Sequence, residues 1–174
     1  MTNTLDKAAN VILILTCLVV LGFTAYRWGP SQKVPTYAVG EVFDPPIVAL
    51  LPQPRGPVVL LALSSRCQVC SLSMPSFRQL ELTRRTNGLS LPLVVLARED
   101  PQTVRSFLLA NNLNTDAIVD VRAVKSKLEQ CPVPHTLVPN AGGVVVGSWV
   151  GLLTDNRLEE VIRALSGALK RPGG

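Results

Sequence analysis

Two cysteines, Cys67 and Cys70, stand where a run of apolar residues gives way to a stretch with helical spacing. The short apolar run 58–63 is typical of a buried strand, and residues 69–85 carry apolar side chains at helical intervals. Both thiols are therefore expected at a helix N-terminus, where free backbone N–H groups and the helix dipole favour a thiolate. Because two intervening residues make one helical turn, the first sulfur faces solvent and the second can close a disulfide behind it. This pattern predicts a redox-active pair.

The same spacing also occurs in half of a zinc site, which is the main alternative for a lone C-x-x-C pair. Four-ligand zinc needs two further Cys or His ligands nearby. The rest of the chain offers only Cys17, Cys131 and His135. We therefore favour redox chemistry and expect neither a metal nor another cofactor.

The N-terminal part of the chain contains 19 residues, 8–26, without a formal charge and rich in Val, Ile and Leu. At 1.5 Å per residue a helix of this length spans about 28 Å of hydrocarbon, which predicts one transmembrane helix. A cleaved signal peptide is the alternative, but cleavage after Ala25 would put bulky Phe23 where a small residue is expected. We therefore predict an uncleaved signal anchor that follows a cytoplasmic tail, 1–7.

The remaining chain is expected to form a linker at 27–37, one domain at 38–170 and a short tail at 171–174. The numbers of positive charges on the two sides of the anchor are nearly equal, so they do not predict its orientation in the membrane. The orientation is therefore inferred from the expected redox chemistry. A tethered dithiol domain is most useful where disulfides form and persist. The prediction is a single-pass protein of a bacterial inner membrane, bound to lipid through its N-terminal helix, with the domain in the periplasm or outside.

The net charge of +5 is accompanied by no nucleic-acid motif, so no nucleic-acid partner is expected. Four arginines lie near the cysteines and are interpreted as a solvated helix face: Arg66, Arg78, Arg84 and Arg85.

Hydrophobic patterning predicts alternating strands and helices along the soluble part. Short edge strands are expected within 38–51, and the helix after Cys67 should bury Val69, Leu72, Phe77 and Leu80. Further strands are expected at 91–97, 117–119, 135–138 and 144–150, with a helix capped by Asp100, a helical piece over 121–128, and a last helix capped by Thr154 or Asn156. This order predicts an α/β fold with a mixed central sheet flanked by helices.

Taken together, these features resemble thioredoxin. The resemblance rests on a strand followed by C-x-x-C at a helix start, a proline at Pro75, and Val133-Pro134 ahead of an antiparallel hairpin and a final helix. It covers about residues 38–170 and implies a thioredoxin-like fold. The membrane anchor and the lead-in Val-Gly-Glu-Val-Phe-Asp-Pro-Pro at 39–46 make the chain most similar to the membrane-tethered TlpA/ResA-like thiol-disulfide oxidoreductases.

A weaker likeness exists to the methylamine dehydrogenase maturation thioredoxins. It rests on the stretches 63–70 and 151–157. No substrate is inferred from it.

The thioredoxin resemblance implies a role for each matching residue. Cys67 is expected to be the attacking thiolate and Cys70 the resolving thiol. Pro134 is expected to be the cis-proline, with the backbone of Val133 pairing with an extended substrate peptide. Pro75 would kink the helix by removing a backbone donor.

Two departures from the family pattern affect the expected chemistry. The position before the first cysteine, usually Trp, holds Arg66, a fixed cation that favours the Cys67 thiolate and is expected to contact substrate together with Val133. No acidic residue occurs at 71–73, where ResA-like proteins have a glutamate, nor in the strand 58–63. Proton transfer from Cys70 is then expected to use water or a residue outside these segments.

Two further residues stand near the expected cis-proline. His135, the one histidine of the chain, follows Pro134 and is a candidate for tuning the pair or for binding a metal, or else is a strand residue pointing aside. Cys131 is either a third redox thiol or a small buried hydrophobe.

These observations leave three functions to compare. The first is a thiol-disulfide oxidoreductase that exchanges disulfides with an envelope protein and is served by a membrane electron donor or acceptor. The second is a copper-handling or other non-catalytic assembly factor, in which Cys67 and Cys70, joined by His135 or Cys131, bind Cu(I). The third is an assembly protein in which the pair is a permanent disulfide.

Overall fold

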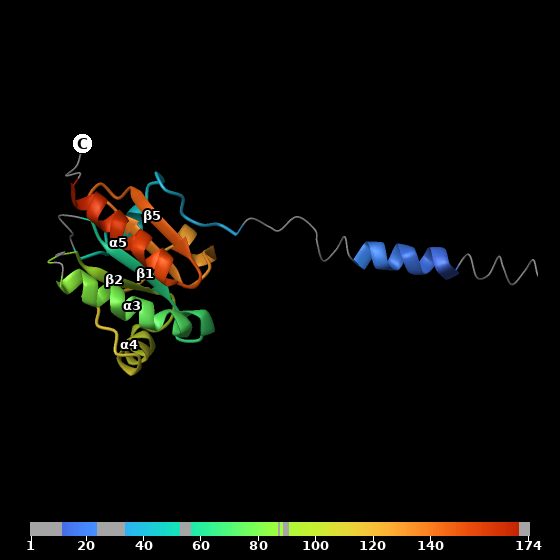
Figure 1. The fold of residues 1–174 in the computed structure, drawn as a ribbon, viewed down its shortest axis with the longest axis horizontal. Coiled ribbons are helices and arrows are strands. Elements are labelled where there is room, and N and C mark those ends of the chain that lie inside the picture. Colours follow the sequence, from blue (N-terminus) through green and yellow to red (C-terminus); the bar gives the residue numbers. More distant parts are fainter. Residues whose placement is uncertain (1–11, 24–33, 53–56, 87, 89–90, 171–174) are drawn as a thin grey trace, which may run out of the picture. The chain divides into compact units, whose positions relative to one another are not determined.

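The computed structural model describes residues 12–23, 34–52, 57–86, 88 and 91–170 (Figure 1). The predicted cytoplasmic tail and C-terminal tail lie outside these residues, as do the ends of the predicted anchor and most of the linker. The chain divides into two units, Met1–Lys33 and Val34–Gly174.

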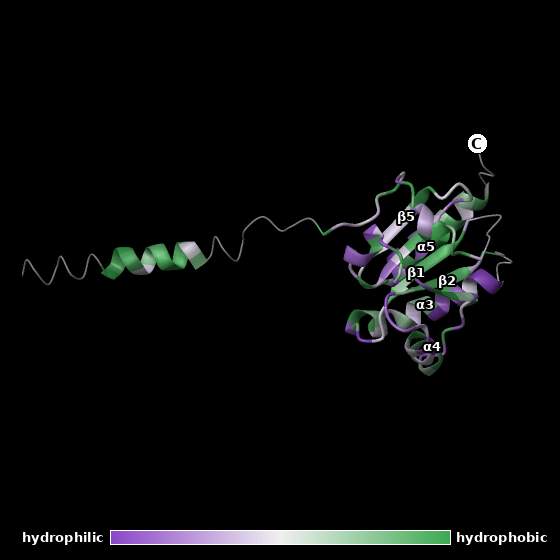
Figure 2. Cartoon of the chain, turned by 180° about the vertical axis from the view of Figure 1, so that it is seen from behind, coloured by the Kyte–Doolittle hydropathy of each residue, from purple (hydrophilic) through white to green (hydrophobic). Residues whose placement is uncertain are grey.

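The first unit contains a helix over residues 12–23 that is apolar over most of its length (Figure 2). Its large apolar side chains are exposed, including those of Ile12, Leu18 and Phe23. Of the helices that the structure describes, none is both long and apolar enough to cross a membrane.

The second unit is built on a five-stranded mixed sheet with the order β3-β2-β1-β4-β5. Its strands are β1 (Val59–Leu63), β2 (Leu93–Ala97), β3 (Ala117–Asp120), β4 (His135–Pro139) and β5 (Val145–Val150). The first three are parallel, and β4 and β5 are antiparallel to their neighbours. The predicted α/β class, with parallel strands and a C-terminal hairpin, is confirmed.

Side chains that alternate along the strands build two cores, one on each face of the sheet. On β1, Leu61 and Leu63 pack into the core that is covered by α3 (Gln68–Thr86), α4 (Pro101–Ala110) and α5 (Asp155–Lys170). Leu60 and Ala62 pack into the opposite core, which we call the lead-in core because residues 37–51 cover it. In Figure 1, α3 and α5 lie side by side across the sheet, in agreement with their contacts, and Figure 2 shows β1 and β2 as hydrophobic ribbons among more polar helices.

The predicted buried face of α3 is partly wrong. Phe77 and Leu80 are buried as expected, but Val69 is 39% and Leu72 is 61% exposed. The buried stripe instead consists of Cys70, Ser73, Met74, Phe77, Leu80 and Arg84. Because four of these six side chains are polar or contain sulfur, the buried stripe does not stand out as a hydrophobic pattern.

Arg84 also differs from the predicted solvated face. Its guanidinium is buried, forms an ion pair of 2.9 Å with Asp116 and donates to the carbonyl of Leu91. Two other arginines of that group have partners within the domain, because Arg78 donates to the carbonyl of Asn111 at 2.8 Å and Arg85 pairs with Glu81. These contacts secure the helix rather than present free charge.

Two short segments take forms other than the expected ones. Within 38–51 the structure has an isolated bridge between Val42 and Val144 and a short helix, α2 (Pro45–Val48), in place of edge strands. The helical piece expected over 121–128 is reduced to the 3₁₀ helix η1 (Lys127–Gln130). Asp100 caps α4 as predicted, since its carboxylate accepts the backbone N–H groups of Gln102 and Thr103.

Candidate redox site

Cys67 occupies the N-cap position of α3, which begins at Gln68. Its sulfur accepts the backbone N–H of Cys70 at 3.1 Å, as the oxygen of a capping side chain would. The turn is closed on its other side by the bond from the Cys67 N–H to the Ser64 carbonyl at 3.2 Å. The Cys67 sulfur therefore lies where the free N–H groups of the first turn of α3 point.

Cys70 is fully buried, whereas Cys67 is half-buried and accessible. The pKa of the Cys70 thiol is raised to about 12, mainly by burial and next by its hydrogen bond with Cys67, and a backbone hydrogen bond with Ser64 opposes part of this shift. Both cysteines are free thiols, one helical turn apart. The pair has the geometry that the spacing predicted, with an accessible first sulfur and a second, protonated one buried behind it.

The loop before β4 approaches the pair from another part of the chain. The Val133–Pro134 peptide bond is cis, and the Cys67 thiol donates to the Val133 carbonyl at 3.5 Å. Val133 is partly exposed and packs against both cores. The structure thus brings four of the predicted site residues together: Cys67, Cys70, Val133 and Pro134.

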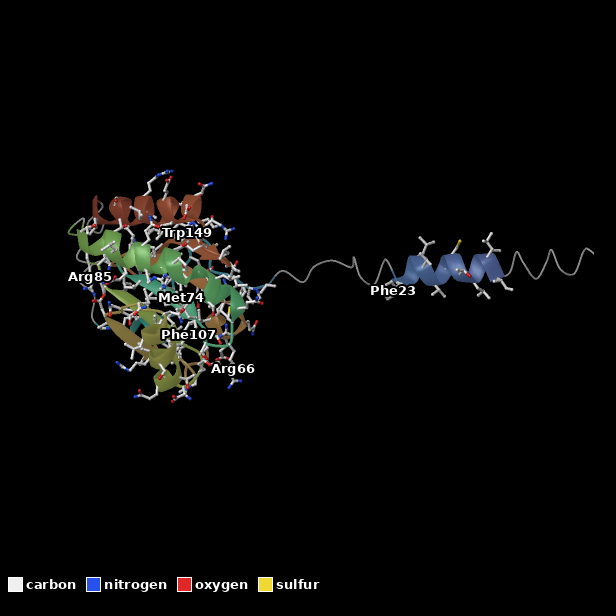
Figure 3. The ribbon with its side chains drawn as sticks, turned by 60° about the horizontal axis from the view of Figure 1, so that its bottom comes forward. Phe23, Arg66, Met74, Arg85, Phe107 and Trp149 are labelled. Carbon is white, nitrogen blue, oxygen red and sulfur yellow. The ribbon has the colours of Figure 1, made fainter. Side chains whose placement is uncertain are left out.

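Arg66 lies at the rim of this site. Its side chain is exposed, and Figure 3 shows it extending from the edge of the domain. Within the part of the chain that the structure describes, its guanidinium forms no hydrogen bond or ion pair, while its backbone N–H donates to the Ser64 hydroxyl at 3.3 Å. The exposed side chains of Val69 and Leu72 follow on α3, so the surface beside Cys67 combines one cation with apolar groups.

His135 faces the lead-in core, away from the cysteine pair. Its ring is fully buried, lies 6.0 Å from the ring centre of Tyr37 and is hydrogen-bonded through Nε2 to the Ser148 hydroxyl at 2.9 Å. Burial, with a smaller contribution from Lys127, lowers the pKa of His135 to about 4. These contacts fit the alternative that this histidine is a strand residue pointing aside.

Cys131 also belongs to the lead-in core rather than to the α3 side of the sheet. Its buried thiol donates to the Lys127 carbonyl at 3.4 Å, and burial raises its pKa. The side chains of His135 and Cys131 therefore lie on the lead-in core side of the sheet, whereas Cys70 lies in the core on the other face. Among the described residues, no group of three or more potential metal ligands is formed.

One acidic residue at the site was missed by sequence reasoning. Glu99 accepts both hydrogen-bond donors of Ser65, the backbone N–H and the hydroxyl, the latter at 3.0 Å. The signal that could have found it is the parallel register, in which Leu63 of β1 pairs with Ala97 of β2. Two residues further along, this register sets Ser65 beside Glu99 at the carboxyl edge of the sheet.

Comparisons with known proteins were made by sequence and by structure. No family model matches the chain, and no curated protein sequence matches it significantly. Solved structures do match. The thioredoxin domain of a thiol-disulfide oxidoreductase from Bacteroides vulgatus has a TM-score of 0.57 at 12% identity, covering 75% of this chain and 99% of that one.

Two further solved structures have somewhat lower TM-scores and higher sequence identity. StoA from Bacillus subtilis has a TM-score of 0.51 at 19% identity, covering 65% of this chain and 84% of that one. A secreted disulfide oxidoreductase of Mycobacterium tuberculosis, homologous to DsbE of E. coli, has a TM-score of 0.51 at 19% identity, covering 79% and 99%. Many structural neighbours are thiol-disulfide oxidoreductases, and the fold of this chain is thioredoxin-like.

Proposed function

We propose that this protein is a thiol-disulfide oxidoreductase that uses Cys67 and Cys70 as its reacting groups. The observation that carries the proposal is the asymmetry of the pair, in which an accessible sulfur caps a helix in front of a buried protonated thiol. The cis Val133–Pro134 bond beside that sulfur and the thioredoxin-like fold support it.

In the reducing direction the proposed reaction has two steps, and an oxidant would run the same steps in reverse. The Cys67 thiolate attacks one sulfur of a partner disulfide, the partner S–S bond breaks, and the released partner thiolate takes up a proton. Cys70 then loses its proton and attacks the Cys67 sulfur, which releases the second partner thiol. Two electrons pass from the pair to the partner. The pair releases its two thiol protons to water, the two partner thiolates take up two protons from water, and the domain is left with a Cys67–Cys70 disulfide.

Val133 and Arg66 are the proposed contacts for the partner. The backbone of Val133 lies where an extended peptide can pair with it beside the Cys67 sulfur. Exposed side chains stand close to Cys67 in the sequence, a cation at Arg66 and apolar groups at Val69 and Leu72. The proposed partner is accordingly an extended polypeptide segment that carries a disulfide or a dithiol.

The proposed setting is a bacterial envelope, with residues 8–26 as a signal anchor and the domain outside the inner membrane. The support is the uncharged apolar sequence of this segment and the use of a dithiol where disulfides persist. In this setting a membrane electron donor or acceptor restores the pair after each exchange.

The test is equilibration of the purified full-length protein with glutathione, followed by labelling of the remaining thiols. We expect the Cys67–Cys70 pair to close and open reversibly, and Cys131→Ser to behave as wild type. A potential near that of thioredoxin, about −270 mV, would mark a reductant, and one near about −120 mV an oxidant. A pair that never equilibrates would overturn the proposal, and stoichiometric Cu(I) binding or a permanent disulfide would then replace it.

A further inference from the structure

We propose that Arg98 and Glu99 are a pair of positioning residues that hold the two halves of the redox site in register. The inference rests on the proposed function and adds residues to it. Arg98 and Glu99 follow β2 directly and precede Asp100, the cap of α4. Their backbone is therefore held between a buried strand and a capped helix.

Glu99 secures the cysteine half of the site. Its two carboxylate oxygens accept the N–H and the hydroxyl of Ser65. The residue before this contact, Ser64, touches both cysteines, because its carbonyl accepts the Cys67 N–H at 3.2 Å and its backbone is hydrogen-bonded to the Cys70 sulfur. Fixing Ser65 thus fixes the turn that sets one sulfur against the other.

Arg98 secures the proline half. Its guanidinium donates to the Glu129 carbonyl in η1 and, at 2.5 Å, to the carbonyl of Cys131, which follows η1 and leads to Val133–Pro134. Two consecutive side chains therefore bind the two loops that meet where the Cys67 thiol contacts the Val133 carbonyl at 3.5 Å. Charged groups that bond directly to backbone in this way are strong positioning contacts.

The chemical consequence differs for the two residues. Closure of the disulfide depends on the effective concentration of one thiol at the other, which rises when the turn is held in one geometry. Glu99 should therefore control the equilibrium of the pair itself. Arg98 should control the rate at which the pair reacts with a disulfide-containing peptide, because that reaction uses the backbone of Val133. It should leave the equilibrium of the pair with glutathione unchanged.

The experiment measures the equilibrium constant of the full-length protein with glutathione in a set of variants. Glu99→Ala removes both hydrogen bonds, whereas Glu99→Gln keeps an acceptor for the Ser65 N–H and a donor for its hydroxyl but removes the charge. Asp116→Ala is the matched control, because Asp116 also accepts a backbone N–H, that of Leu93 at 2.6 Å, but at the start of β2. Ser65→Ala removes one of the two bonds to Glu99.

We expect Glu99→Ala to lower the constant for disulfide formation about tenfold, a shift of about 30 mV to a less negative potential. Ser65→Ala should lower it about threefold, and Glu99→Gln and Asp116→Ala should stay within about twofold of wild type. Arg98→Ala should keep the constant but react at least fivefold more slowly with a disulfide-containing peptide, and Arg98→Lys should recover part of that rate.

Several results would overturn the proposal. One is a Glu99→Ala protein whose equilibrium constant with glutathione equals that of wild type. Another is a Glu99→Gln protein whose constant falls as far as that of Glu99→Ala, which would assign the effect to charge. If the equilibrium constant of Asp116→Ala falls as far as that of Glu99→Ala, the effect would come from general destabilisation of the fold. If Glu99→Ala does not fold, Ser65→Ala decides.

A wild-type pair that does not equilibrate would refute the proposed function rather than the positioning role. The iodoacetamide labelling rate of Cys67 then tests Glu99, with at least a threefold change expected in Glu99→Ala and none in Glu99→Gln.

Discussion

Cys67 and Cys70 have the same side chain but different surroundings. One sulfur is reachable and accepts a helix N–H, and the other is buried with its pKa raised to about 12. The raised pKa keeps Cys70 protonated at neutral pH, and in the proposed reaction Cys70 attacks only after the Cys67 sulfur has been joined to a partner.

This difference predicts distinct outcomes for the two serine variants. Cys70→Ser should accumulate a mixed disulfide between Cys67 and a disulfide-containing peptide, because the resolving thiol is missing. Cys67→Ser should form none, since the buried thiol does not take over the attack. Mass spectrometry of the acid-quenched reaction measures both. Equal adducts in the two variants would contradict the assignment of roles.

His135 predicts a pH dependence of stability. Its pKa is lowered from 6.5 to about 4 by burial and by Lys127, so the folded protein keeps the ring neutral while the unfolded chain protonates it. Stability from this residue is complete above pH 6.5 and is lost as the pH falls from 6.5 to 4, by about 3 kcal/mol in total.

Urea unfolding at several pH values between 4 and 7 measures this loss. His135→Gln, which takes up no proton in this range, should flatten the profile even if it is less stable at pH 7. An unchanged slope in the variant would assign the pH dependence to other groups.

At the scale of elements, α3 carries the site and also much of the core. Its inner stripe includes Phe77 and Leu80, while Val69 and Leu72 face outward near Cys67. Ser73 ties the helix to the segment before α5, because its hydroxyl accepts the Leu153 N–H at 3.3 Å and donates to the Val69 carbonyl at 2.9 Å.

The two faces of α3 predict opposite responses to truncation. Phe77→Ala should reduce the free energy of unfolding by about 3–5 kcal/mol, because it leaves a cavity in the core. Leu72→Ala should change it by no more than about 0.5 kcal/mol, since the side chain is 61% exposed. Chemical denaturation of both proteins provides the comparison, and a large loss in Leu72→Ala would contradict the observed face.

At the scale of the whole molecule, the chain separates a short apolar helix from the domain that holds the site. The unit Val34–Gly174 contains the sheet, both cores and all residues of the redox pair. Residues 8–26 are the proposed membrane anchor.

This division predicts that attachment and redox chemistry are separable. A protein that begins at residue 34 should leave the membrane fraction while its glutathione equilibrium stays within about twofold of the full-length value. Cell fractionation with an alkaline wash, followed by the glutathione titration, measures both properties. A truncated protein that still sediments with membranes would argue against the anchor.

Most elements of this fold can be predicted from local sequence patterns. Continuous apolar runs predicted β1 and β2, the patterns at 135–138 and 144–150 predicted β4 and β5, and Asp100 predicted the start of α4. The thiol pair was predictable for the same reason, because its strand and helix are adjacent in sequence. The resemblance to thioredoxin also led to Val133–Pro134, whose peptide bond is cis.

The tertiary structure alone decided two kinds of feature. These are the face of the sheet on which a residue lies, and the contacts between segments that are distant in sequence. The alternation of β4 turns His135 toward Tyr37 and away from Cys70, and packing rather than periodicity selects the buried stripe of α3. Glu99 reaches Ser65 across 34 positions because parallel strands end at the same edge of the sheet. Short-range signals determined the elements and the reacting thiols, whereas the groups that position those thiols are brought together by folding alone.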